Sequence, residues 1–331
     1  MTQIGAVVIG RNEGARLRRC LESTLPQVDL IVYVDSLSTD DSVVLARSLG
    51  AEVVELDRQQ PITAARARNA GWQRLRELAP DIELVQFIDG DCEMTAGWVL
   101  HAVAAIDSEP QAAVVTGRLR ERYREQTIYN RLCDLEWDRP VGDAQECGGI
   151  ALMRMAALVA VDGFNSRLIA GEEPELCVRL RAAGWKIKRV GREMALHDAA
   201  MTRFGQWWKR TVRAGHAYAE GAAMHGSSAQ RHWVRQSRSI MFWGGLLPIT
   251  AFLLAWPTSG TSLILLSGYG LLACRVARHG RSRGWSWKDS ILYAAFTTLG
   301  KFPQFIGQVK YHWTRWTGEH AVLIEYKGAA Q

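Results

Sequence analysis

The chain has 331 residues, enough for one large domain or two ordinary ones, and its 48% hydrophobic content excludes a disordered protein. Its 40 lysines and arginines outnumber 34 aspartates and glutamates, which gives a net charge of +6, and the basic residues become denser from Arg203 onward. This distribution favours a membrane surface or an anionic substrate over sequence-specific binding of nucleic acid.

The cysteines and the N-terminus bear on the cell compartment. The six cysteines are scattered singly, with no CxxC pair, which predicts reduced and mostly packed thiols in a cytosolic environment. The opening sequence MTQIGAVVIG is a short β-type run and lacks the basic, apolar and cleavage regions of a signal peptide. We therefore expect a protein that is not exported.

Short apolar runs alternate with helical patterns through the first 90 residues. The expected strands cover residues 4–9, 30–34, 51–56 and 84–88, and the expected helices cover residues 15–25, 41–49 and 62–78. Strands that alternate with helices at this spacing predict right-handed crossovers and a parallel sheet, and therefore an α/β fold.

Polar residues follow three of these expected strands. The first strand runs into Arg11-Asn12-Glu13, the second into Asp35-Ser36 and the fourth into Asp89-Gly90-Asp91. Because ligands of such sheets bind beyond the carboxyl ends of the strands, we expect the site along this edge. The first strand lacks a following GxGxxG, which disfavours dinucleotide binding, and the chain has no GxxxxGK(S/T) phosphate loop.

The pair Asp89 and Asp91 is the first candidate for metal binding. Two carboxylates separated by one glycine can reach the same hard cation, and Mg²⁺ or Mn²⁺ held by few carboxylates and by substrate phosphates is the expected ion. Asp-Gly is also common turn chemistry, so a plain β-turn is the alternative.

A second acidic group lies in GEEPEL, where Glu172 and Glu173 begin an expected helix that ends at Gly184. Carboxylates at that position also stabilise the helix dipole without further function. The other candidates have ordinary explanations too. Asp35 could be a helix cap, Arg68 could lie on a solvated helix face, and His197 could belong to a buried structural pair.

A long uncharged stretch distinguishes the C-terminal third. Residues 239–274 contain no charged side chain, and residues 257–260 form an expected turn between halves of about 14 to 18 residues, at or below the lower limit for a spanning helix. Both ends carry arginines, namely Arg231, Arg235 and Arg238 before the stretch and Arg275, Arg278, Arg281 and Arg283 after it. We expect a membrane hairpin with cytoplasmic ends, or alternatively a buried helical hairpin. A third membrane or interfacial helix is expected at residues 290–309.

Five motifs in order, VVIGRNEGARLRRCLES, YVDSLSTDDS, ARARNAGW, FIDGDCE and GEEPELCVRLRAAGW, resemble the glycosyltransferases of family 2. The resemblance covers residues 1–215 and implies a catalytic domain with the GT-A nucleotide-sugar-binding, Rossmann-like α/β fold. We expect a basic linker or amphipathic helix at residues 216–238 and an apolar, membrane-associated helical region at residues 239–331.

The resemblance also implies roles for matching residues. Those expected to contact the nucleotide sugar are Asn12, Glu13, Asp35, Arg68, Asp89 and Arg210, and those expected to hold Mg²⁺ or Mn²⁺ are Asp89, Asp91 and His197. Glu173 is the candidate general base. The family usually has Glu-Asp where this chain has Glu-Glu-Pro, so Glu172 stays open as the alternative.

Such enzymes typically invert the anomeric centre by direct displacement. The segment RFGQWWKRTVRAG matches only part of the Q-x-x-R-W motif of processive synthases, so we expect addition of one or a few sugars. Its cations Arg203, Lys209, Arg210 and Arg213 suit either a diphosphate or the surface of an anionic membrane.

These expectations combine into one function. The chain is expected to be a metal-dependent inverting glycosyltransferase of the cell inner membrane, with a cytoplasmic catalytic domain and a membrane-linked lipid or polysaccharide-precursor acceptor. A homo-oligomer is compatible with the sequence, and nucleic acid is not an expected partner. The alternatives are an inactive nucleotide-sugar-binding scaffold and a nucleotidyltransferase. The donor sugar, its base and the linkage depend on the shape of the pocket rather than on motifs.

Overall fold

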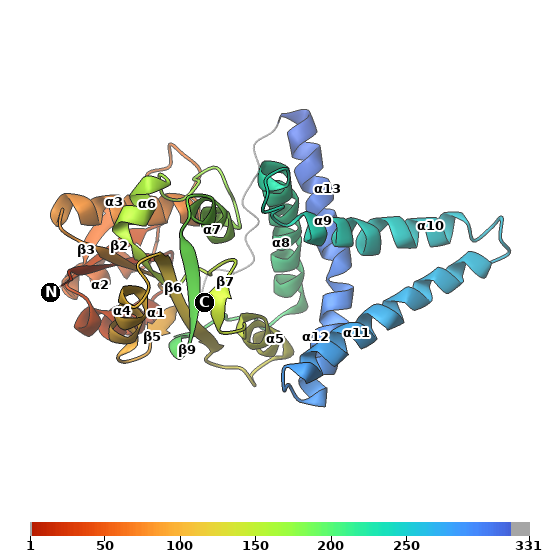
Figure 1. The fold of residues 1–331 in the computed structure, drawn as a ribbon, viewed down its shortest axis with the longest axis horizontal. Coiled ribbons are helices and arrows are strands. Elements are labelled where there is room, and N and C mark those ends of the chain that lie inside the picture. Colours follow the sequence, from red (N-terminus) through yellow and green to blue (C-terminus); the bar gives the residue numbers. More distant parts are fainter. Residues whose placement is uncertain (1, 319–331) are drawn as a thin grey trace. The chain divides into compact units, whose positions relative to one another are not determined.

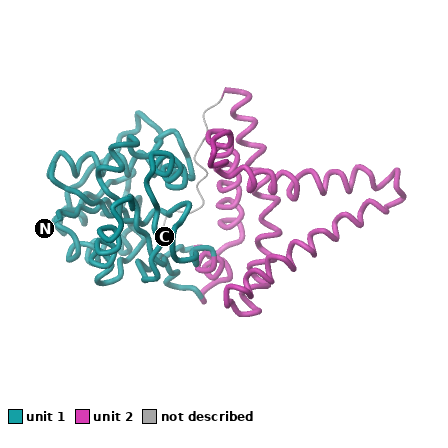
Figure 2. Tube along the Cα trace, viewed as in Figure 1, with its two compact units in different colours: residues 1–124, 136–200, 328–331 teal, residues 125–135, 201–327 magenta. Residues whose placement is uncertain are grey.

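The computed structural model describes residues 2–318, and these divide into two compact units (Figure 2). The sheet unit comprises residues 2–124 and 136–200, and the helical unit comprises residues 125–135 and 201–318. The division falls between Ala200 and Met201, whereas the expected boundary at residue 215 lies inside a long helix. Part of the expected apolar region, residues 319–331, lies outside the described residues.

Within the described residues, nine strands form one mixed sheet with the order β3-β2-β1-β4-β8-β6-β9-β5, and β7 pairs with β9 (Figure 1). The strands are β1 (Ile4–Gly10), β2 (Leu30–Asp35), β3 (Glu52–Glu55), β4 (Leu84–Asp89), β5 (Cys92–Met94), β6 (Ala112–Glu121), β7 (Gly142–Ala144), β8 (Ala151–Arg154) and β9 (Lys186–His197). The four strands expected from the sequence are β1 to β4, and they are parallel as predicted.

The helices of the sheet unit cover both faces of this sheet. They are α1 (Ala15–Thr24), α2 (Ser42–Ser48), α3 (Ala64–Leu78), α4 (Trp98–Asp107), α6 (Met155–Ala160) and α7 (Glu172–Ala182), with a short turn η1 (Leu25–Gln27) after α1. Side chains of β1 alternate between two cores, because Val7 packs in one cluster while Ala6 and Val8 pack in the other. This alternation follows from the two-residue period of a strand.

Local chemistry sets the start of the two helices that matter most for the site. The Thr63 hydroxyl caps α3 by accepting a hydrogen bond of 3.1 Å from the Arg66 amide. Helix α7 begins after Gly171, whose φ of 82° suits glycine, and Pro174 lies in its first turn. These helix starts place Glu173 in the first turn of α7 and Arg68 in the second turn of α3.

The helical unit contains most of α5 (Ile128–Trp137), whose last two residues belong to the sheet unit. Its other helices are α8 (Phe204–His225), α9 (Val234–Met241), η2 (Phe242–Leu246), α10 (Leu247–Leu253), η3 (Thr261–Ser267), α11 (Gly268–Ser282), α12 (Trp287–Leu299) and α13 (Lys301–Thr317). Helices α8 and α13 cross closely because glycines lie at the contact. A Cβ at Gly215 would overlap the Gln304 backbone, and one at Gly307 would overlap the Val212 carbonyl oxygen. The bundle is therefore built around α8 and α13.

Residues 239–274 form a helical hairpin whose limbs meet near α10 and η3 (Figure 1). Many of its apolar side chains are exposed, which contradicts the alternative of a buried hairpin. In the part of the chain that the structure describes, no helix has both the length and the apolar character needed to cross a membrane.

Candidate active site

Sheet register brings the predicted site residues to one edge. Gly10 lies opposite Asp35 on β2, and Ile9 lies opposite Asp89 on β4. The Asp-Gly-Asp sequence after β4 is indeed a tight connection, since β5 begins at Cys92. The turn and the predicted site are therefore compatible. Asp35 ends β2, Asp89 ends β4 on the other side of β1, and Asp91 lies in the connection to β5.

Asp35 is buried and organises the loop that follows β2. The Tyr33 hydroxyl donates a hydrogen bond of 2.9 Å to its Oδ1, and the Ser38 amide donates one of 2.7 Å to its Oδ2. Burial and the Asp35 charge raise the pKa of Tyr33, so this phenol stays a neutral donor. Asp35 is thus held by the chain itself, with the loop wrapped around it.

Asn12 joins the loop after β1 to the loop after β2. Its side-chain oxygen accepts a hydrogen bond of 2.7 Å from the backbone amide of Thr39, and its backbone amide donates one of 2.9 Å to the Ser38 hydroxyl. Glu13 lies one residue on and pairs with Arg16 at 2.8 Å. Asn12 and Asp35 thus both bind the loop after β2, and the nucleotide-binding roles of both residues and of Glu13 stay predictions.

Arg68 on α3 is the centre of a buried charge cluster. Its guanidinium lies 2.9 Å from Asp89 Oδ1, 2.9 Å from Glu172 Oε1 and 3.0 Å from Glu173 Oε1. With 3% of its side chain exposed, it is not part of a solvated helix face, which was the structural alternative. One cation facing three carboxylates leaves the Arg68 cluster with an excess of negative charge.

The two glutamates of this cluster have different surroundings. Glu172 is buried against Arg68, whereas Glu173 keeps 14% of its side chain exposed. Enclosure by the protein, followed by repulsion from Glu172, raises the pKa of Glu173 to about 7, although Arg68 opposes the shift. Glu173 is therefore the glutamate with both solvent access and a pKa suited to proton transfer near neutral pH.

Gly149, in the loop before β8, closes over the Arg68 cluster. A Cβ at this position would lie 2.5 Å from Arg68 Nη2 and 2.8 Å from Asp89 Oδ2. Only glycine leaves room for these side chains here. The sequence analysis missed this residue, and the Gly148-Gly149 pair was the one signal that marked it.

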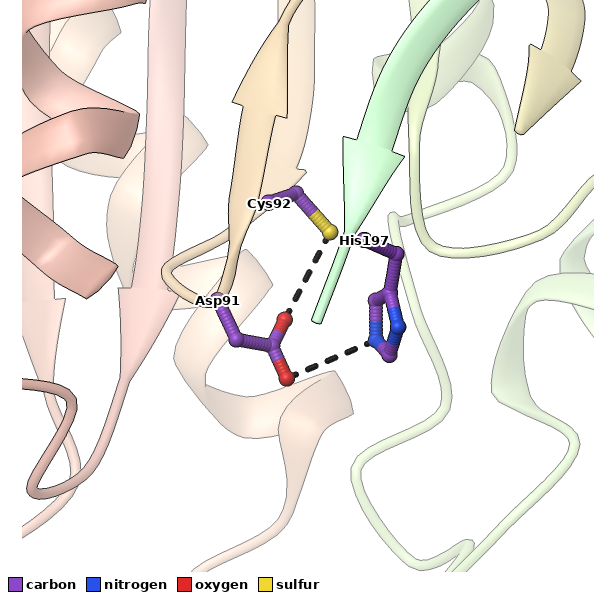
Figure 3. A group of neighbouring side chains, drawn as sticks. All are labelled: Asp91, Cys92 and His197. Carbon is purple, nitrogen blue, oxygen red and sulfur yellow. Dashed lines mark hydrogen bonds and ion pairs between the residues drawn. The ribbon is translucent and has the colours of Figure 1, made fainter. Parts of the chain in front are cut away.

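A second cluster contains donor atoms suited to a metal ion (Figure 3). Asp91, Cys92 and His197 each offer one ligand atom, and these atoms lie within 4.8 Å of one another. His197 Nε2 is 3.4 Å from Asp91 Oδ2, and the Cys92 thiol donates to Asp91 Oδ1 across 3.5 Å. A carboxylate and an imidazole are common ligands of Mn²⁺ and related ions, so the donor set fits a divalent metal.

The β6 and β9 strands orient His197. Register places His197 opposite Glu121 on β6 and opposite Cys92 on β5, and its Nδ1 lies 3.7 Å from Glu121 Oε2. The Trp137 ring contacts the imidazole edge-to-face at 4.7 Å between centroids. A carboxylate behind the second ring nitrogen is a common arrangement for metal-binding histidines. No local sequence pattern marks Glu121 or Trp137, because their proximity to His197 depends on how distant segments pack together.

Not every predicted residue belongs to this metal group. Asp89 lies outside the group of Asp91, Cys92 and His197, and its Oδ1 accepts a hydrogen bond from Arg68. Cys92 lies inside it, although the sequence analysis did not select it. Arg210 lies on α8 in the helical unit, and its role stays a prediction.

Comparison with known proteins gives three further findings. Residues 6–155 match the family model described as Glycosyl transferase family 2. An uncharacterized glycosyltransferase of Rickettsia felis is 46% identical over 54 residues, which cover 16% of this chain and 19% of that protein. A TPR repeat-containing protein of Synechococcus elongatus is 31% identical over 143 residues, which cover 42% of this chain and 33% of that protein. The chain thus spans a fifth to a third of these curated relatives.

Among solved structures, the mannosyltransferase PcManGT from Pyrobaculum calidifontis, in complex with GDP-Man and Mn²⁺, has a similar fold. Its TM-score is 0.59 at 16% identity, and the alignment covers 95% of this chain and 88% of that one. The predicted mixed α/β fold of the GT-A type is therefore confirmed. The resemblance to family 2 is confirmed over residues 6–155, whereas the membrane-associated type stays a prediction.

Proposed function

We propose that this chain, whose residues 6–155 carry a glycosyltransferase family 2 domain, is a metal-dependent enzyme that transfers sugar from a nucleotide donor to a membrane-linked acceptor. The observation that carries the proposal is the gathering of Asp35, the Arg68 cluster and the Asp91–His197 group at one edge of the sheet. The acceptor is a lipid or a polysaccharide precursor, and the transfer inverts the anomeric centre without processivity.

The donor is proposed to lie across the ends of β1, β2 and β4. Asp35 would contact the nucleobase or ribose, and Asn12 and Glu13 would line the same pocket, since hydrogen bonds join the loop after β1 to the loop after β2. Asp89 would face the ribose while Arg68 fixes one of its oxygens. The rigid pairing of these side chains lowers the cost of ordering them around a ligand.

Asp91 and His197 are proposed to hold Mg²⁺ or Mn²⁺. When bound there, such an ion would neutralise the negative charge that grows on the departing diphosphate. The solved relative with a similar fold contains Mn²⁺ and GDP-Man, which supports a divalent ion and a nucleotide-sugar donor for this chain.

Glu173 is proposed as the general base. The acceptor hydroxyl would pass its proton to a Glu173 carboxylate oxygen while its own oxygen forms a bond to the anomeric carbon. The bond from that carbon to the diphosphate breaks in the same displacement, so the configuration inverts. A pKa of about 7 lets Glu173 accept a proton near neutral pH and release it afterwards.

The membrane-linked acceptor is supported by the composition of the helical unit. An uncharged hairpin with exposed apolar side chains is flanked by arginines on both sides, as expected for a protein that meets its substrate at a lipid surface. We accordingly propose that the enzyme acts at the inner membrane with its catalytic domain in the cytoplasm.

The test combines donor binding with transfer. Purified full-length protein is screened with nucleotide sugars and Mn²⁺ for thermal stabilisation, and the best donor is then assayed with polyprenyl phosphate and membrane lipid extracts. Asp91→Asn is expected to lower transfer by orders of magnitude, and the neighbouring Asp198→Asn serves as the matched control. Undiminished transfer in Asp91→Asn with a metal chelator present would overturn the metal assignment.

The same assays separate the alternative functions. Donor binding without transfer to any lipid or glycan extract would favour an inactive scaffold. Release of pyrophosphate from a nucleoside triphosphate and a sugar phosphate would favour a nucleotidyltransferase.

A further inference from the structure

The hairpin formed by residues 239–274, here called the apolar hairpin, exposes large side chains that most proteins bury. Leu253 is 73% exposed, Trp256 is 94% exposed and Ile264 is 75% exposed. They are part of a larger exposed set that also includes Leu246, Ile249, Phe252, Leu254, Leu263, Leu265 and Leu271. This many exposed large apolar side chains within one hairpin indicate an interaction surface, since their exposure to water is costly.

Three hydroxyl groups in and beside the turn of the apolar hairpin donate to nearby backbone carbonyls. The hydroxyl of Thr258 donates to the Leu254 carbonyl at 2.6 Å, and that of Ser262 donates to the Ala251 carbonyl at 2.7 Å. The Thr261 hydroxyl donates to the Thr258 carbonyl at 2.9 Å. A turn in water has no need of such pairing, whereas a turn in hydrocarbon depends on it.

Backbone amides of the turn also donate hydrogen bonds within the hairpin. The amide of Thr258 donates to Leu254, and the amide of Gly260 donates to the Ala255 carbonyl at 2.7 Å. The amide of Leu263 donates in turn to the Gly260 carbonyl. These hydrogen bonds carry the chain from one limb into the other and pair backbone amides that would otherwise oppose transfer into lipid.

Cations lie at the base of the apolar hairpin and not at its turn. The arginines Arg231, Arg235 and Arg238 precede it, and Arg275, Arg278, Arg281 and Arg283 follow it. At the same end, Arg281 lies over the Trp287 ring at 5.1 Å and Arg283 over the Trp285 ring at 4.8 Å. Arginine and tryptophan together are typical of a lipid headgroup layer, and their charge complements anionic lipids.

The length of the limbs limits how deep the turn can reach. Residues 239–254 would span about 24 Å even if the whole limb were α-helical. The hydrocarbon core of a bilayer is about 30 Å thick. With the arginines held at one headgroup layer, the turn therefore ends short of the opposite layer.

We propose that the apolar hairpin inserts into a bilayer with anionic headgroups from the side of its arginines, and that its turn, residues 255–260, stays inside the membrane. The lipid bilayer is the occupant that fits an uncharged tip and a cationic base at once. This inference concerns membrane insertion and does not depend on which reaction the sheet unit performs.

The first experiment measures binding to vesicles. Full-length protein is mixed with vesicles of phosphatidylglycerol and phosphatidylethanolamine, or of phosphatidylcholine alone, and separated by flotation in high salt. The double variant Leu253→Glu/Ile264→Glu is expected to lose at least tenfold in the bound fraction. Leu100→Glu is the matched control, since Leu100 is 77% exposed on α4 and lies in the sheet unit. Equal flotation of both variants would overturn the proposal.

The second experiment measures the depth of the turn. Cys274 is the one exposed cysteine among the described residues, so Cys274→Ser gives a background for single labels. A spin label at Ser259→Cys is expected to be accessible to oxygen and shielded from a water-soluble nickel chelate, and a label at Ser282→Cys is expected to show the reverse. Access of an impermeant reagent to residue 259 from the vesicle interior would show a spanning hairpin and overturn the proposal.

Two other occupants of the apolar surface remain as outcomes of these experiments. If the protein stays unbound to every vesicle and forms a dimer that the Leu253→Glu/Ile264→Glu variant dissociates, a second copy covers the surface. If it stays unbound and monomeric, the surface serves another protein. Either result contradicts insertion into lipid.

Discussion

The edge of the sheet and the apolar hairpin each place side chains in unusual surroundings, and they differ in how the chain compensates. At the sheet edge, charged groups are buried, and the Arg68 guanidinium forms ion pairs of 3.0 Å or less with Asp89, Glu172 and Glu173. In the apolar hairpin, Leu253 and other apolar groups are exposed without comparable cover. Buried charge can be balanced inside a chain, whereas exposed apolar surface needs a partner outside it.

The difference also concerns which property each region serves. The Glu173 carboxyl is enclosed by the protein and lies beside the Glu172 charge, and these two causes, burial first, raise its pKa to about 7. In the apolar hairpin, the hydroxyls of Thr258 and Ser262 donate to carbonyls of the same hairpin, while its large apolar side chains stay exposed. Changes at the sheet edge should therefore alter chemistry and folding of the sheet unit, while changes in the apolar hairpin should alter location alone.

The largest effect is expected from Glu173→Gln. Removing the proposed base should lower the transfer rate by about 100- to 10,000-fold, because general base catalysis contributes on that order. Donor binding should persist, since glutamine keeps the size of the side chain and an oxygen for Arg68. Steady-state transfer and thermal stabilisation by the donor measure the two properties separately.

The matched control for this change is Glu172→Gln. Glu172 contacts the same guanidinium but is buried, so its loss should reduce transfer much less. If the two variants lose activity in the opposite order, Glu172 is the base and the assignment made here is wrong.

The next largest effect is expected from Arg68→Ala on the stability of the sheet unit. Three carboxylates would lose their shared cation, and breaking a buried ion pair of this kind costs about 3–5 kcal/mol. Arg66→Ala is the control on the same helix, because its partner Asp57 is largely exposed and the loss should be far smaller. Urea unfolding followed by a signal from the sheet unit measures both.

The pH dependence of that loss gives a further check. In Arg68→Ala, the carboxylates can relieve their repulsion by taking up protons, so the destabilisation should shrink as pH falls from 8 to 5. A loss that is constant over this range would mean that Arg68 stabilises by packing and not by charge.

A smaller effect is expected from Gly307→Ala in the helical unit. Its Cβ would overlap the Val212 carbonyl oxygen where α13 crosses α8, and overpacking of this kind costs about 1–3 kcal/mol. Gly205→Ala on α8 is the control, since a Cβ there meets nothing within 4 Å. Thermal unfolding of both variants is the measurement, and equal stability would show that the crossing can relax.

Much of the sheet edge could be predicted because its polar residues directly follow the strands in the sequence. Apolar runs that end in Asp35 and Asp89 identified both the strands and the edge at which they meet. The partners from distant strands could not be found in this way. Glu121 and Cys92 reach His197 only because β6, β9 and β5 pair in a particular register. No local pattern encodes that pairing.

In the helical unit, composition predicted a local feature but not how distant helices pack together. The uncharged stretch and its arginines predicted a hairpin, and residues 239–274 do form one. The boundary at residue 215 was set by the extent of the family resemblance, yet α8 continues to His225, and its Gly215 packs on α13. Composition therefore located the hairpin, while the crossing of α8 and α13 depends on contacts between residues about 90 positions apart.

The smallest predicted effect tests how the Arg68 cluster sets the pKa of Glu173. Burial is the main cause of its value of about 7, and the charge of Glu172 is the next. Transfer needs deprotonated Glu173, so kcat/KM should rise as pH increases through about 7 and level off above it. Glu172→Gln removes one negative neighbour, favours the charged form of Glu173 and should move this limb to lower pH by roughly half a unit to one unit. Because a base of lower pKa is deprotonated to a greater extent at pH 6, the ratio of variant to wild-type activity should be higher at pH 6 than at pH 8, although the variant's activity at pH 8 falls below that of the wild type.

The control for this shift is Glu22→Gln, a change on the exposed side of α1, which should leave the pH dependence of kcat/KM unchanged. A limb that does not move in Glu172→Gln would separate the pH dependence from Glu173 and leave its origin with another group of the site.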